Sequence, residues 1–390
     1  MIRHENRVIS DFAKEFNFDD IRPYYDHEVQ PMLQRIIKDL IFMQLISNLW
    51  PEMTFEEVKK KSQNIHSSYE FQLEFMHAAI RKILELSSSG LSSDGFDQLD
   101  PNKSYLFIAN HRDILLDAAI LQVLLVEHGF KTSEISFGSN LREQGFITDF
   151  GKLNRMFTVL REGTSKELYE ISRKLSAYIR HSILDKNVSV WIAQRNGRTK
   201  DGGDFTQSGL LKMLNISGKK HHFVENFNKL NIVPLSISYE YEPCDYLKTQ
   251  EIYLSNLHTR YTKAPGEDLN SIVTGIRQFK GKIHMSVGAP FTEKELTAID
   301  KFENENDKIK AFATIIDKKL YEQFKCNPVN YIAADLLEHS YKRAAKYTPE
   351  QKQGFVDYMS KNILKLTGEP EVLEHVFLKI YATPVLNKGE

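Results

Sequence analysis

Short apolar runs alternate with helical patterns through the middle of the chain, and this alternation constrains the fold more than any other feature. The runs have the length and apolar character of buried strands; they cover 105–109, 157–160, 188–193, 232–241 and 283–287. Helical spacing of apolar residues follows the first two runs, over 114–127 and 164–184. Strands that alternate with helices favour an α/β fold, in which a mixed, mostly parallel sheet is covered by flanking helices.

Helical patterns also precede this segment. Apolar residues recur at helical spacing over 31–50, and a second helix is expected to begin at a capping sequence that runs from Thr54 to Glu57. The stretch 87–95, SSSGLSSDG, is expected to form a loop, because serine and aspartate side chains compete for backbone hydrogen bonds and glycine is flexible. We therefore expect an N-terminal helical region over 1–95.

The last hundred residues again show helical spacing. After Pro290, helices with charged outer faces are expected over 301–324, 329–344, 349–366 and 371–381. The sequence therefore predicts an α/β domain over 96–290 and a C-terminal helical region over 291–390.

The composition argues against several classes of protein. Lys and Arg number 51 against 52 Asp and Glu, and this balance disfavours a nucleic-acid-binding protein. Two cysteines are too few for a disulfide framework and favour a reducing compartment. The N-terminal residues lack the apolar stretch of a signal peptide, and the longest apolar run, Leu40 to Trp50, falls short of the roughly 20 residues that span a bilayer. We therefore expect a cytoplasmic protein.

One predicted strand ends in residues that can move a proton. The sequence YLFIANHRDILLD over 105–117 places Asn110 and His111 between a strand and a helix. A histidine can take a proton from a hydroxyl near neutral pH, and a carboxylate can fix its tautomer. Asp113 and Asp117 are both candidates for that carboxylate. No G-x-S-x-G sequence indicates a serine nucleophile. The alternative is that His111 and Asp117 are an ordinary loop histidine and an aspartate on a helix surface.

Arginines follow two further predicted strands. The run FTVL is followed by Arg161, and the run VWIA is followed by a loop that contains Arg195 and Arg198. A guanidinium group matches a phosphate or carboxylate with two parallel hydrogen bonds, so these loops are candidates for an anion site. A third run, IVPLSI, places Pro234 early in a buried strand, where the loss of a backbone donor is tolerated.

In this order, these segments resemble the sequence blocks of the glycerol-3-phosphate and 1-acylglycerol-3-phosphate (lysophospholipid) acyltransferase family. The family blocks are N-H-x4-D, a strand ending in arginine, F-P-E-G-T-R-S and a strand with V-P. Asn110 and His111 match the first block, with five residues rather than four before Asp117, and Val233-Pro234 matches the last. The resemblance covers roughly residues 100–245 and implies a glycerophosphate acyltransferase-like fold.

The resemblance also implies a mechanism. His111 would deprotonate the acceptor hydroxyl, which attacks the thioester carbonyl of acyl-CoA or acyl carrier protein, and Asp117 would orient His111. Neither a metal nor a redox cofactor is implied. The residues expected to bind an anionic lipid acceptor are Arg112, Arg161, Arg195, Asn196, Gly197 and Arg198.

The third block departs from the family pattern. If Gly197 is the family glycine, Asn196 stands where glutamate is usual, and Arg198 lies one position before the usual arginine. This departure keeps open a lipoamino acid acceptor, in which a carboxylate replaces the phosphate. Further alternatives are a catalytically weak lipid-binding or scaffold protein of the same fold, and a hydrolase that uses water as the acceptor.

A membrane contact is a separate expectation. The helix predicted over 32–50 has a broad apolar face, with Arg35 and Lys38 near its rim. Such a face is compatible with peripheral contact with the inner face of a membrane. Packing of the same face against the protein core is the alternative.

Overall fold

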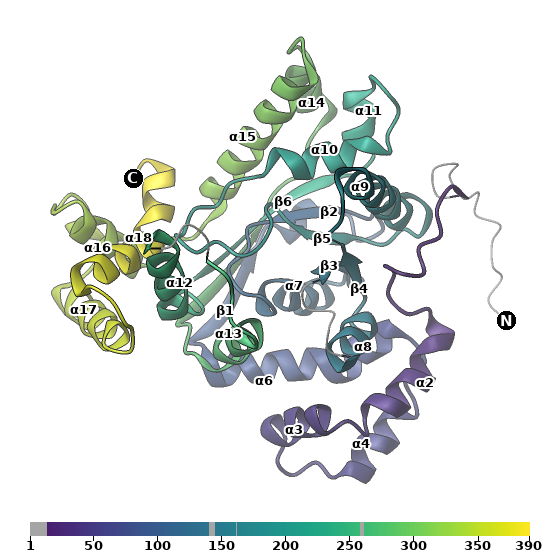
Figure 1. The fold of residues 1–390 in the computed structure, drawn as a ribbon, viewed down its shortest axis with the longest axis horizontal. Coiled ribbons are helices and arrows are strands. Elements are labelled where there is room, and N and C mark those ends of the chain that lie inside the picture. Colours follow the sequence, from purple (N-terminus) through teal and green to yellow (C-terminus); the bar gives the residue numbers. More distant parts are fainter. Residues whose placement is uncertain (1–13, 140–144, 161, 258–260) are drawn as a thin grey trace.

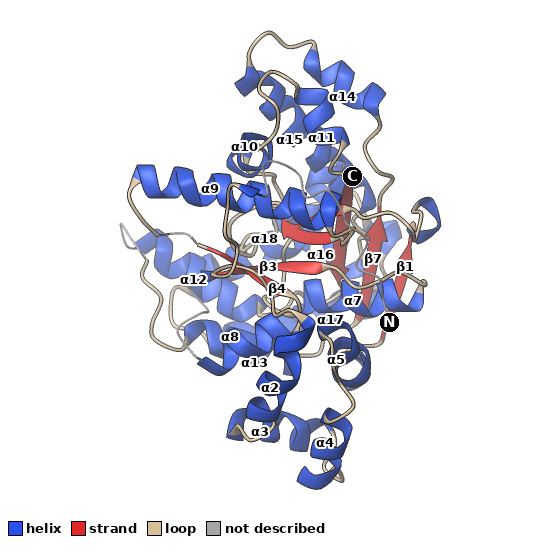
Figure 2. Ribbon diagram, turned by 90° about the vertical axis from the view of Figure 1, so that its right-hand side faces the viewer, coloured by secondary structure: helices blue, strands red, loops and turns tan. Residues whose placement is uncertain are grey.

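The computed structural model describes residues 14–139, 145–160, 162–257 and 261–390, and its centre is a seven-stranded sheet (Figures 1 and 2). The strand order is β1-β7-β6-β2-β5-β3-β4. The strands are β1 (Gly90–Asp94), β2 (Leu106–Ala109), β3 (Glu134–Gly138), β4 (Met156–Val159), β5 (Val190–Ala193), β6 (Ile232–Tyr239) and β7 (Lys282–Val287). Neighbouring strands are parallel except β6 and β7, which are antiparallel. The predicted mixed, mostly parallel α/β sheet is therefore confirmed.

Helices cover both faces of this sheet. On β2, Phe107 and Ala109 belong to one hydrophobic core, and Leu106 and Ile108 belong to a second one. A strand that is buried on both faces has no polar alternation, which explains its continuous apolar run. The first core includes α6 (His77–Ser87) and α7 (Leu116–Glu127); the second includes α9 (Ser165–Arg180), α10 (Ser208–Ile216), α11 (Phe223–Asn228), α14 (Glu293–Asp300) and α15 (Glu305–Gln323).

Two strands lie outside the sequence prediction. The prediction of a loop over 87–95 is wrong, because Gly90–Asp94 forms a strand that pairs in parallel with β7 at the edge of the sheet. Its residues alternate between exposed and half-buried, so neither an apolar run nor a β-branched side chain marks the strand. The second is β3, where Glu134 is buried and forms an ion pair with Lys186. Pairing with distant strands, rather than local propensity, determines both elements.

The N-terminal helical region is divided into more helices than its apolar pattern predicts. The helix expected over 31–50 is two helices, because the Asp39 side chain accepts a hydrogen bond from the backbone N–H of Ile41 and begins a new helix. The elements are α2 (Asp26–Ile36), α3 (Leu40–Leu49), α4 (Phe55–Ser62), α5 (Ser68–Phe71) and a π-helical turn (Gln72–Met76) that leads into α6. Within the described ranges, no helix is both long and apolar enough to cross a bilayer.

The C-terminal helices pack beside α12 (Asp245–Leu257) at one end of the sheet (Figure 1). They are α16 (Pro328–Leu337), α17 (Pro349–Ile363) and α18 (Pro370–Lys388). Two further α-helices are α8 (Gly145–Leu153) and α13 (Glu267–Arg277). Tyr358 and Tyr381, from α17 and α18, donate hydrogen bonds of 2.7 and 2.6 Å to the buried carboxylate of Asp245. Buried polar contacts therefore connect the C-terminal helices to the α/β part of the chain.

Candidate active site

A short loop between β2 and α7 brings His111 and Asp117 together. Nδ1 of His111 lies 2.9 Å from Oδ2 of Asp117, which is in the first turn of α7. The same oxygen accepts the backbone N–H groups of Arg112 and Asp113, at 2.6 and 2.9 Å. The loop therefore folds around the Asp117 carboxylate, and this absorbs the extra residue between His111 and Asp117.

The electrostatics of Asp117 favour its ionised form. Complete burial opposes ionisation, but the hydrogen bond and charge of His111 and the two backbone donors outweigh it, so the pKa of Asp117 lies below its ordinary value. A carboxylate at Nδ1 holds the imidazole with its other nitrogen, Nε2, as the proton acceptor. Nε2 of His111 has no hydrogen-bond partner among the described residues, and the ring remains partly exposed.

Asp113, the other candidate carboxylate, has a different role. Its Oδ1 accepts the backbone N–H groups of Leu115 and Leu116 at 2.9 and 2.7 Å, and so caps the start of α7. Burial and the nearby charge of Asp117 raise the pKa of Asp113. Asp117 is therefore the carboxylate that contacts His111, and Asp113 supports the helix.

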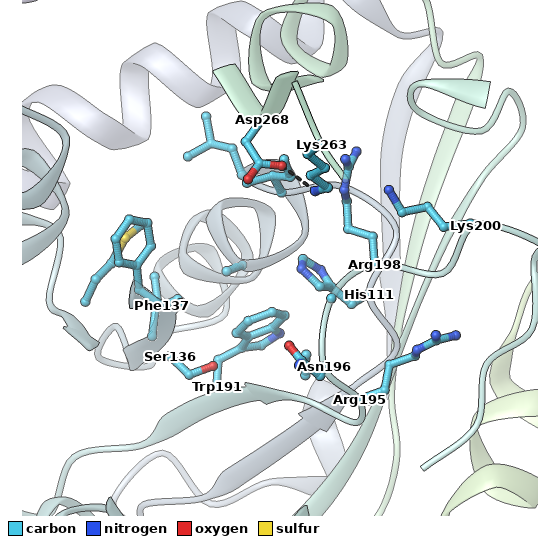
Figure 3. A pocket seen from close by; sticks show the side chains of 18 of the residues that line it. His111, Ser136, Phe137, Trp191, Arg195, Asn196, Arg198, Lys200, Lys263 and Asp268 are labelled. Atoms are coloured by element: carbon cyan, nitrogen blue, oxygen red, sulfur yellow. Dashed lines mark hydrogen bonds and ion pairs between the residues drawn. The ribbon is translucent and has the colours of Figure 1, made fainter. Parts of the chain in front are cut away.

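His111 opens into a pocket of about 430 Å³ at the carboxyl end of the central strands (Figure 3). This is the position where open α/β sheets generally bind ligands. Apolar side chains from β3, β4, β5 and the start of α7 line one part; they include Ile135, Phe137, Met156, Trp191, Ile114 and Ala118. Arg195, Arg198 and Lys200 line the other part, and His111 lies between the two in the close view.

Basic side chains exceed acidic ones in the pocket wall. Lys200 forms an ion pair with Glu251 of α12, and Lys263 forms one with Asp268 of α13 at 2.5 Å. Arg195 and Arg198 therefore supply the excess positive charge. Nη1 of Arg198 is buried without a hydrogen-bond partner among the described atoms.

Burial also affects Lys200. The loss of solvent, and the neighbouring charge of Arg198, lower the pKa of Lys200 to about 8 although Glu251 opposes the change. The charge of the basic part of the pocket therefore depends on pH just above neutrality.

Of the predicted anion-binding residues, Arg195, Asn196, Gly197 and Arg198 line the pocket. Gly197 has a φ of +75°, a backbone conformation that residues with a Cβ atom rarely adopt. This conformation turns the loop sharply. The guanidinium of Arg195 stacks on the ring of Phe205, 4.4 Å from its centroid. The predicted residue Arg161 lies outside the described residues.

Arg112 is placed differently from the expectation. Its side chain is 1% exposed and forms ion pairs with Asp204 at 2.5 Å and Glu242 at 3.1 Å. It also donates to the backbone carbonyl of Gly202. Arg112 does not line the pocket; it holds the end of the arginine-containing loop against the strand ends. Its predicted role in acceptor binding is therefore not supported, because two buried carboxylates already neutralise its charge.

Sequence reasoning missed several residues of the site. Lys263, Asp268 and Glu251 line the pocket but follow no predicted strand. Tyr239, at the end of β6, donates a hydrogen bond of 2.8 Å to Oδ1 of Asp117. The sequence predicts its place in the strand that contains Val233-Pro234, but not its hydrogen-bond partner.

No family model matches the chain, and no curated protein matches it. Among solved structures, the chain is similar to the crystal structure of the 1-acyl-sn-glycerophosphate (LPA) acyltransferase, PlsC, from Thermotoga maritima. The identity is 13%, the similarity covers 76% of this chain and 94% of the other, and the TM-score is 0.39.

Proposed function

We propose that this protein is an O-acyltransferase that moves a fatty acyl group from an acyl thioester to the hydroxyl of an anionic lipid precursor. The observation that carries the proposal is the position of His111, with a free Nε2, between an apolar and a basic part of one pocket. An acyl chain fits the apolar part, and an anionic head group fits the part that contains Arg195 and Arg198.

The reaction follows from this placement. Nε2 of His111 takes the proton of the acceptor hydroxyl while the hydroxyl oxygen attacks the thioester carbonyl carbon. The resulting tetrahedral intermediate releases the thiol of coenzyme A or acyl carrier protein, and the departing sulfur receives the proton from His111. Asp117 stabilises the imidazolium that forms between these two steps. Each atom is accounted for without a metal or a redox cofactor.

The acceptor we favour is a glycerophosphate or lysophospholipid, as in phospholipid biosynthesis. A phosphate in the basic part of the pocket would accept hydrogen bonds from the guanidinium groups of Arg195 and Arg198. Asn196 lines the pocket at the position where the acyltransferase family pattern has a glutamate. This departure makes a lipoamino acid, which carries a carboxylate in place of the phosphate, the second acceptor to test.

The test is acyl transfer by purified protein from acyl-CoA and from acyl carrier protein to a panel of lyso acceptors, with the products identified by mass spectrometry. We predict that His111→Ala lowers kcat by about 10²–10⁴, the usual contribution of a general base. The matched control is His181→Ala, because Nδ1 of His181 makes a similar contact of 2.8 Å with Asp185 outside the pocket.

The outcomes separate the alternatives. Acylation by His111→Ala at a rate close to that of His181→Ala would contradict the proposal. Release of free fatty acid without an acylated product would favour a hydrolase. Binding of lyso lipid without turnover by the unmodified protein would favour a lipid-binding or scaffold role.

We also propose peripheral contact with a membrane through α3. This helix contains no charged residue, and Leu40, Ile41 and Leu45 are exposed on one side while Phe42 and Ile46 pack inside. Exposed apolar side chains of this kind can insert into the interface between lipid head groups and acyl chains. Such a contact would bring a lipid acceptor close to the protein.

A further inference from the structure

Tyr239 is a fully buried tyrosine that contacts Asp117 from β6, a strand that is far away in the sequence but pairs with β2. It ends β6, and its side chain belongs to the same core as α7. Its hydroxyl donates a hydrogen bond of 2.8 Å to Oδ1 of Asp117. Burial and the charge of Asp117 raise the pKa of Tyr239 well above its ordinary value, so the hydroxyl remains a donor at any working pH.

The two oxygens of Asp117 have separate partners. Oδ2 contacts His111 and the backbone N–H groups of Arg112 and Asp113. Oδ1 accepts from Tyr239, and no other donor to this oxygen is found in the described part of the chain. Rotation about the Cβ–Cγ bond moves both oxygens together, so a donor at Oδ1 opposes any rotation that would carry Oδ2 away from His111.

We propose that Tyr239 is a positioning residue, which holds the Asp117 carboxylate in the plane that presents Oδ2 to His111. This inference rests on the proposed function in so far as His111 is the base. Its physical content concerns only the contact between the carboxylate and the imidazole, so it can be tested without substrate.

Other charged groups face this cluster and must be held constant. Asp113 lies on the same loop, Glu242 follows the end of β6, and Arg198 faces Asp113 from the pocket loop. Trp191 of β5 packs edge-on against the His111 ring at 5.6 Å between centroids. None of these side chains is changed by the substitution below.

The test is Tyr239→Phe, which keeps the ring and removes the donor. The matched control is Tyr178→Phe, because the Tyr178 hydroxyl also donates to a buried carboxylate, Glu134, at 2.7 Å but outside the pocket. Both variants lose a hydrogen bond to a buried carboxylate, and Tyr178→Phe also loses a weaker contact of 3.4 Å from Lys186, so its unfolding temperature is expected to fall at least as much as that of Tyr239→Phe.

The decisive measurement is the NMR signal of the proton between Nδ1 of His111 and Asp117, observed with ¹⁵N-labelled histidine and assigned with His111→Gln. In Tyr239→Phe, the Asp117 carboxylate can turn away from the imidazole, which weakens this contact. We expect the signal to move upfield and kcat to fall by about threefold or more. In Tyr178→Phe, neither quantity is expected to change.

A double-mutant cycle with Asp117→Asn distinguishes positioning from a general structural effect. If Tyr239 acts through Asp117, Tyr239→Phe changes neither the His111 proton signal nor kcat further in the Asp117→Asn protein. Equal effects in both backgrounds would overturn the inference, as would a Tyr239→Phe signal identical to that of Tyr178→Phe. A protein without acyltransferase activity would refute the proposed function but leave the NMR result intact.

Discussion

The two carboxylates that follow His111 differ in what they contact. Replacing each of them with asparagine is therefore expected to have a different effect. Asp117 meets the imidazole, whereas Asp113 caps α7. Asparagine caps a helix about as well as aspartate, so we expect Asp113→Asn to keep kcat within about threefold of the unmodified protein. We expect Asp117→Asn to lower kcat by about 10²–10⁴, because an amide cannot stabilise the imidazolium. Steady-state acylation rates check both values, and the reverse order would assign the partner of His111 to Asp113.

Lys200 predicts a pH dependence in acceptor binding. Its pKa is lowered to about 8, so the side chain is charged below that value and becomes neutral as the pH rises through it. We expect KM for the anionic acceptor to increase by about tenfold above pH 8. This factor corresponds to the loss of one hydrogen bond between charged groups. Lys200→Arg stays charged and should give a flat KM over the same range. A KM that rises equally in both proteins would show that another group titrates.

Among the helices, α3 carries the prediction about membranes. Burying an apolar side chain contributes about 1.5–3 kcal/mol, so replacing Leu40, Ile41 and Leu45 with aspartate should reduce binding to anionic vesicles by more than about tenfold. The control is Leu364→Asp, which changes a leucine that is 86% exposed in the C-terminal region. Vesicle flotation measures both, and equal flotation of the two variants would exclude α3 as the contact. Phe42 is left unchanged because it packs in the interior.

The loop after β5 and the loop after β2 are held together by Arg112. The ion pairs of Arg112 with Asp204 and Glu242, and the contact of Lys248 with the Arg112 carbonyl at 2.7 Å, join three separate elements around the pocket. Removing one member of a buried ion pair leaves the other charges uncompensated. The arrangement of His111 and the pocket arginines therefore depends on a residue that does not face the pocket.

At the level of the whole molecule, the C-terminal helices are expected to unfold together with the α/β part. Tyr381→Phe removes the donor to Asp245 and the acceptor of the Glu242 N–H, so we expect a loss of about 1–3 kcal/mol in unfolding free energy. Both tryptophans, Trp50 and Trp191, lie outside the C-terminal region. Urea unfolding should therefore shift equally by tryptophan fluorescence and by circular dichroism.

The control for this experiment is Tyr331→Phe, which removes an exposed hydrogen bond to Glu390 and should leave both transitions in place. If Tyr381→Phe shifts only the circular dichroism transition, the C-terminal helices form an independent unit.

The sequence by itself determined the class of fold and the position of His111. The continuous apolar run of β2 reflects burial on both faces, and the residues that follow it directly, Asn110 and His111, necessarily lie at the carboxyl end of a central strand. These features depend on neighbouring residues in the sequence, so the pattern of apolar and polar residues predicts them. The pocket loop with Arg195 and Arg198 follows β5 for the same reason.

Only the tertiary structure decided which partners these residues have. It added β1 and β3 to the sheet, selected Asp117 over Asp113, buried Arg112 between two carboxylates and brought Tyr239 of the neighbouring strand β6 to Asp117. Each of these outcomes depends on contacts between segments far apart in the chain or on the exact course of a loop. The burial, hydrogen bonding and charge environment of a side chain depend on such contacts, so a local sequence pattern cannot predict them.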